Sequence, residues 1–86
     1  MLTANQGEAA ARDIQDWAIR IAGRVDDAVH VDVSAETDSS TYVVRLASGA
    51  RVLIFRLSES QIRTDGREAE CERTLLRKIK DLSNLL

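Results

Sequence analysis

Residues 50–57, Ala-Arg-Val-Leu-Ile-Phe-Arg-Leu, carry four bulky apolar side chains in succession, from Val52 to Phe55. Side chains alternate between the two faces of a β-strand, so a strand with one wet face should alternate apolar and polar residues. Here both faces of the expected strand carry bulky apolar side chains. The fold must therefore cover this strand on both sides or leave an apolar face open to solvent.

The segments before this run alternate as half-buried strands do. Residues 29–36, Val-His-Val-Asp-Val-Ser-Ala-Glu, place an apolar side chain at every second position. Residues 41–47 resume the pattern, and their expected core side consists of Tyr42, Val44 and Leu46. Ser48 and Gly49 then predict a turn into a third strand, residues 50–57. Because turns this short cannot connect parallel neighbours, we expect a three-stranded antiparallel meander.

The register of the second hairpin depends on the loop at Ser48 and Gly49. A two-residue loop formed by these residues pairs Val44 with Leu53, whereas a three-residue loop shifts the pairing by one residue. We expect the first register, because it places the larger side chains of the third strand on the core side. A second apolar set then remains on the opposite face: Val43, Val52 and Ile54 in the first register, or Val43, Leu53, Phe55 and Leu57 in the second.

A helix precedes the strands. Apolar side chains recur at steps of three and four residues, which places them on one helical face: Ala10, Ile14, Trp17, Ala18, Ile21 and Ala22. Asn5, with Glu8 three residues later, predicts a capping box at the helix start. Gly23 predicts the end of the helix.

A second helix follows the strands and occupies most of residues 65–86. Its apolar stripe consists of Leu75, Leu76, Ile79, Leu82, Leu85 and Leu86. Asp65 and Glu68 have the spacing of a capping box. Between the third strand and this helix, the sequence allows either a loop or an early helical turn started by Ser58 and Gln61.

The order helix, three strands, helix predicts a single α+β domain, αβββα, spanning residues 1–86, with a meander sheet flanked by the two helices. The chain is too short for two independent cores. Either one helix packs on each face of the sheet, or both gather on one face and the other stays open. In the second case the open face predicts a partner surface, most simply a homodimer. The candidate interface residues are Val43, Val52 and Ile54 on the sheet and Leu82 and Leu86 on the last helix.

Equipment for catalysis or for cofactor binding is absent from the sequence. His30, Asp32 and Ser34 share the outward face of the first strand, but successive side chains on one strand face lie about 7 Å apart, too far for a nucleophile to hydrogen-bond its base. The single cysteine, Cys71, has no metal-ligand partner at a suitable spacing, and no glycine-rich phosphate loop is present. We therefore expect no enzyme, no cofactor, no metal and no small-molecule substrate.

The net charge of −2 does not draw the chain toward nucleic acid or an anionic membrane. The N-terminus shows no basic region followed by an apolar run, and no stretch has the length of a membrane span, so the expected location is the cytoplasm. Helix-strand-strand-strand-helix is also the order in double-stranded RNA-binding domains. Here, however, the last helix begins with acidic residues where such a domain needs lysines.

The leading hypothesis is a non-enzymatic protein-interaction module, expected to be a homodimer. One alternative is a nucleic-acid-associated regulator that contacts phosphates through Arg63, Arg67, Arg73, Arg77 and Lys80. Against it, basic residues late in a helix are what the helix dipole favours without any ligand. The other alternative is an inhibitor or adaptor that meets a larger protein as a monomer.

Overall fold

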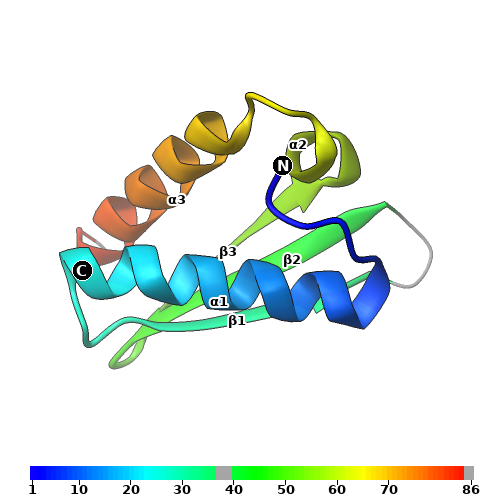
Figure 1. Ribbon diagram of the computed structural model, residues 1–86. Helices are drawn as coiled ribbons and strands as arrows, with labels where there is room; N and C mark the ends of the chain where they lie inside the picture. Colours follow the sequence, from blue (N-terminus) through cyan, green and yellow to red (C-terminus); the bar gives the residue numbers. More distant parts are fainter. Residues whose placement is uncertain (37–39, 85–86) are drawn as a thin grey trace.

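The sheet has three antiparallel strands in the order β1-β2-β3, and the computed structural model describes residues 1–36 and 40–84. Its elements are α1 (Gly7–Val25), β1 (His30–Ala35), β2 (Thr41–Ser48), β3 (Arg51–Ser58), α2 (Glu59–Arg63) and α3 (Glu68–Ser83). The predicted α+β architecture and meander are confirmed (Figure 1). The short helix α2 resolves the alternative that the sequence left open after the third strand.

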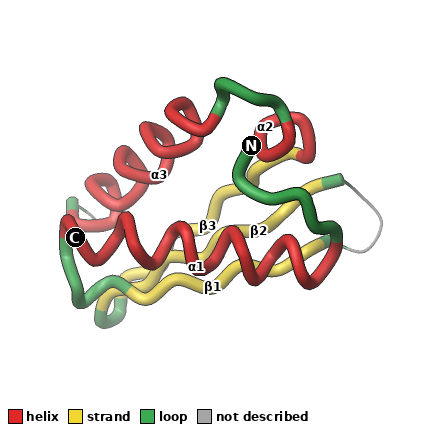
Figure 2. The backbone as a smooth tube through the Cα atoms, viewed as in Figure 1, coloured by secondary structure: helices red, strands yellow, loops and turns green. Residues whose placement is uncertain are grey.

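All three helices cover the same face of the sheet. Figure 2 shows α1 running along β1, with α3 on the same side, and α3 also contacts β2 and β3. One cluster of buried side chains joins the helices to the core side of the strands, including Ile14, Leu46, Leu57, Ile62 and Leu75. The other face has no helix over it within the described part of the chain. Of the two arrangements that the sequence allowed, the structure adopts the one-sided arrangement.

The core side of the second hairpin is as predicted, but neither predicted register is correct. Gly49 and Ala50 form the two-residue loop, so that Ser48 pairs with Arg51 and Val44 with Phe55. Gly49 has φ of +61°, and no other type of residue has a positive φ in the described chain. Glycine in the left-handed region at the first central position is the requirement of a type II′ turn, which suits the twist of a hairpin. The expected loop would have given Ser48 that conformation instead.

Both long helices begin without the capping boxes predicted for them. The side chain of Asn5 donates a hydrogen bond to Asp13 at 2.7 Å, and α1 starts at Gly7 without a side-chain cap. Gly23 does not end α1, which continues to Val25. At α3, Gly66 has φ of +88°, and the helix starts after Arg67 without a side-chain cap.

The capping box that does form is the one at α2. The Ser58 hydroxyl accepts from the backbone N–H of Gln61, and the side chain of Gln61 accepts from the backbone N–H of Ser58 at 2.8 Å. A five-residue helix is too short to persist alone, so this cap and the burial of Ile62 hold it in place. Of the loop and the early helical turn that the sequence left open here, the structure adopts the helical turn.

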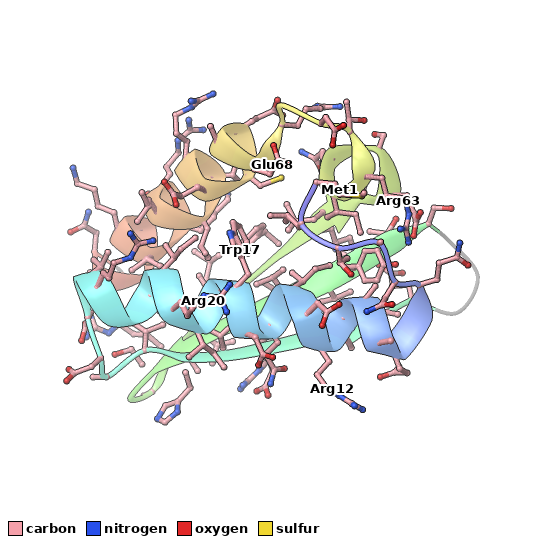
Figure 3. The ribbon with its side chains drawn as sticks, viewed as in Figure 1. Met1, Arg12, Trp17, Arg20, Arg63 and Glu68 are labelled. Atoms are coloured by element: carbon pink, nitrogen blue, oxygen red, sulfur yellow. The ribbon has the colours of Figure 1, made fainter. Side chains whose placement is uncertain are left out.

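A hydrogen-bonded cluster ties α2 to the sheet and to the N-terminal segment. The Tyr42 hydroxyl donates to the Glu59 carboxylate at 2.8 Å, and Arg63 pairs with the same carboxylate. Arg63 also donates to the backbone carbonyl of Asn5 at 2.6 Å, and Figure 3 shows its side chain beside that segment. Hydrogen bonds from Arg63 and then from Tyr42 lower the pKa of Glu59 below its ordinary value.

Acid is therefore expected to destabilise the fold through Glu59. A carboxylate whose pKa is lower in the folded chain stabilises it above the unfolded pKa of about 4.3, and this stability is lost as pH falls through the folded value. Urea unfolding of wild type and Glu59→Gln at pH 7 and pH 3, in dilute protein, measures this contribution. The wild type should lose more stability between the two pH values than the variant. Equal losses would contradict a role for Glu59 in acid sensitivity.

Candidate functional site

The face of the sheet opposite the helices carries an apolar strip made of Val43, Ala47, Val52 and Ile54. Val52 and Ile54 on β3 are 42% and 54% exposed, while Val43 and Ala47 on β2 are partly buried. Ala47 lies directly opposite Val52, and Arg45 lies opposite Ile54. Ala47, Val52 and Ile54 are neighbours across the two strands, and Val43 lies diagonally from Ile54, beyond Arg45.

Ion pairs direct the charged groups of this face toward its β1 side. The Arg45 guanidinium lies 3.7 Å from the Asp32 carboxylate on β1. Arg56, although on β3, donates to the Glu36 carboxylate at 2.8 Å, beyond the end of β1. Both pairs are well exposed and contribute little to stability. They instead affect how charge is distributed over the face, because they leave its β3 half apolar around Val52 and Ile54.

The structure places four of the five predicted interface residues, in two different environments. Val43, Val52 and Ile54 lie together on the open face, in the arrangement expected for the first register. Leu82 is completely buried in the core beneath the helices, so it cannot contact a partner on the folded chain. Leu86 lies outside the described residues. The strip therefore keeps the sheet residues, and it gains Ala47, which the alternation of β2 could have identified.

The five basic residues predicted to contact nucleic acid divide into two groups. Arg63 is engaged by Glu59 and by backbone carbonyls of the N-terminal segment, and Arg67 pairs with Glu70 at 3.0 Å. The remaining three are exposed on α3 at the spacing of one helical face: Arg73, Arg77 and Lys80. Arg63 and Arg67 are paired within the fold, so the five residues do not form one continuous basic surface.

Asp32 and Cys71, which were considered as catalytic or metal-binding residues, both contact other groups of the fold. Asp32 pairs with Arg45 on the open face. Cys71 is buried, its thiol contacts the backbone carbonyl of Gln61 at 3.5 Å, and burial followed by the charge of Glu70 raises its pKa. In residues 1–36 and 40–84, no group of three or more His, Cys, Asp or Glu side chains is arranged to hold a metal ion.

A cleft of about 420 Å³ opens between the N-terminal segment, α1 and the start of α3. Figure 3 shows Met1, Trp17, Arg20 and Glu68 around it. Its lining mixes both signs of charge with one aromatic ring and does not define a single ligand chemistry. The apolar strip is the better-defined candidate, because its side chains share one chemistry and lie on a sheet face that no described helix covers.

No protein family, curated protein or solved structure matches the chain. Among the helices of the described residues, none combines the length and the apolar character that crossing a bilayer requires.

Proposed function

We propose that this protein is a non-enzymatic protein-interaction module that forms a homodimer through the apolar strip and the edge strand beside it. The observation that carries the proposal is the exposure of Val52 and Ile54 on a sheet face that no described part of the chain covers. A domain of this size buries only about 60 to 65% of the surface of its unfolded chain, so burial through a second copy adds to its stability.

The expected affinity follows from the burial that remains available. Complete burial of a valine or isoleucine side chain contributes roughly 1.5 to 3 kcal/mol, and about half of this is still to be gained at Val52 and at Ile54. Full burial of the four side chains of two copies sets an upper limit of roughly 3 to 6 kcal/mol on this contribution, before the cost of lost rotational and translational freedom. Additional contacts are needed for a stable complex, and we expect a weak dimer.

Sedimentation equilibrium over a wide concentration range tests this function. We expect wild type to pass from monomer to dimer, and Ile54→Lys to weaken the dimer by about tenfold or more, because a charge replaces an apolar contact. Ile19→Lys is the matched control, since Ile19 is exposed to a similar extent, 47%, but lies on α1, on the other side of the sheet. It should leave the equilibrium unchanged.

A wild type that stays monomeric at every concentration would refute the homodimer. The strip would then belong to a contact with a different protein, as in the monomeric adaptor. Equal weakening by Ile54→Lys and Ile19→Lys would show that charge in general, and not the strip, controls association.

A further inference from the structure

The two edges of the sheet differ in how their backbone groups are satisfied. At the β1 edge, the outward backbone N–H of Val33 donates to the side chain of Gln15 on α1 at 3.0 Å. At the β3 edge, the turn fixes which groups point outward. Ser48 and Arg51 close a two-residue loop and form a hydrogen-bonded pair, so every second residue from Arg51 bonds to β2 and the residues between them face away.

The outward-facing residues of β3 are therefore Val52, Ile54 and Arg56. The contact of Ser58 supports this assignment, because its N–H, next in the same series, bonds to Gln61 on α2 and not to β2. Among the described residues, nothing accepts a hydrogen bond from the outward N–H groups of the other three. Such a row of unpaired groups on an edge strand is a template for another strand.

The strand itself lacks the usual protection against such pairing. Edge strands are commonly blunted by proline, by a bulge or by being short. β3 has eight residues, contains no proline and keeps a regular register along its whole length. Of its two arginines, Arg56 is the one on the open face, and it pairs there with Glu36.

We propose that two copies pair through β3, antiparallel and centred on Ile54, to form one continuous six-stranded sheet. This inference rests on the proposed function and specifies how the homodimer is built. The two-fold axis places Ile54 opposite Ile54 of the second copy and Val52 opposite Arg56 of the second copy. Val52, Ile54 and Arg56 then all exchange backbone hydrogen bonds with their partners, so that their outward N–H and C=O groups are all paired.

The residue pattern of β3 is compatible with a second copy of itself. Around Ile54, each arginine falls opposite an apolar residue, since Arg56 meets Val52 and Arg51 meets Leu57. The two Arg56 residues are about 13 Å apart along the strands, beyond the screening length of about 8 Å at physiological salt. The apolar strips of the two copies become neighbours on the joined sheet, so that Val52 and Ile54 are shielded on the side facing the second copy while their outer surface stays open to solvent.

Backbone hydrogen bonding favours this arrangement over face-to-face packing. Pairing at the β3 edge adds backbone hydrogen bonds to the apolar contact, which packing of the open face alone does not provide.

Amide hydrogen exchange, resolved by residue with NMR, tests the pairing. When roughly nine-tenths of the chains are paired, the amides of Val52, Ile54 and Arg56 should exchange about tenfold more slowly than in dilute protein, because they exchange only after the copies separate. The amides of Leu53 and Phe55 serve as internal controls, since β2 already protects them in the monomer.

A charge series at one position provides the second test. In the proposed register Val52 faces Arg56 of the second copy, so Val52→Glu should bind about tenfold more tightly than Val52→Lys. In face-to-face packing both variants bury a charge, and both should weaken the dimer alike. Thermal unfolding of each variant in dilute protein confirms that the monomer still folds.

The outcomes separate the two proposals. A wild type that never dimerises overturns both. A wild type that dimerises while the three amides exchange at the dilute rate, or while both Val52 variants weaken it equally, overturns the edge pairing and leaves the homodimer standing. Slowed exchange at alternate amides, together with the charge preference, supports the six-stranded sheet.

Discussion

Replacing Leu46 by alanine is expected to lower the free energy of unfolding by about 2 to 5 kcal/mol. Leu46 lies on the central strand, opposite Leu53, and is completely buried between the sheet and the helices. Truncation removes its apolar contacts and leaves a cavity, because a packed core relaxes only partly around a missing side chain. A domain of this length has a total stability of about 4 to 13 kcal/mol, so this one change removes a large share.

Urea unfolding at a fixed low protein concentration measures this loss without a contribution from association. Ile54→Ala is the matched control, because Ile54 is on the neighbouring strand but 54% exposed on the opposite face. In dilute protein it should cost less than about 1 kcal/mol, since the truncated atoms are already partly in water. If the two variants lost equal stability, the distinction between a packed face and an open face of the sheet would be wrong.

Enlarging Ala18 to leucine is expected to destabilise the fold by about 1 to 3 kcal/mol, although the substitution adds apolar surface. Four alanines of α1 are buried to 1% exposure or less: Ala10, Ala11, Ala18 and Ala22. Their small side chains let the helix lie close along β1, so a leucine at Ala18 has no space and must displace its neighbours.

Ala9→Leu is the control for this prediction, since Ala9 is exposed on the same helix. Alanine and leucine have similar helix propensities, so the exposed substitution should change the free energy of unfolding by no more than about 0.5 kcal/mol. Chemical denaturation of both variants makes the comparison. An Ala18→Leu variant as stable as wild type would mean that α1 is not closely packed on the sheet.

Local patterns in the sequence predicted the elements well, and predicted their ends poorly. The alternation of residues 29–36 and 41–47 and the helical spacing of the apolar residues mark which side of each element is buried. The capping boxes failed because the helices begin later than the predicted caps require: Gln6 precedes α1 and Arg67 precedes α3. Asn5 has the right residue type, but α1 begins at Gly7, so the cap position falls on Gln6, and the Asn5 side chain instead donates to Asp13, eight residues further on. A spacing rule does not determine the residue at which the helix begins.

The hairpin register failed for a related reason. The sequence indicated a glycine-containing turn, and the structure uses that glycine, but one residue further along the loop than expected. The observed pairing differs from the expected one by two residues, since Val44 pairs with Phe55 and not with Leu53. Because side chains alternate with a period of two, this shift leaves the same side chains facing the core. The prediction of Val43, Val52 and Ile54 as one apolar set was therefore correct even though their cross-strand partners were not.

Leu82 shows where the prediction of the candidate site reached its limit. Its helical spacing is equally suited to packing on the sheet and to contacting another helix, and only the position of α3 over the sheet assigns it to the core. The same applies to Arg63, which was grouped with the basic residues of α3 by charge. The fold turns it toward Glu59 and the N-terminal segment.

The sequence by itself determined that β3 has two apolar faces, because alternation in an extended strand follows from backbone geometry alone. Tertiary structure decided that the three helices share one face, that α1 protects the β1 edge through Gln15, and that the β3 edge and the strip beside it stay open. These properties depend on contacts between segments far apart in the chain. Their free energies are set by how whole elements pack, which the pattern within any single segment does not contain.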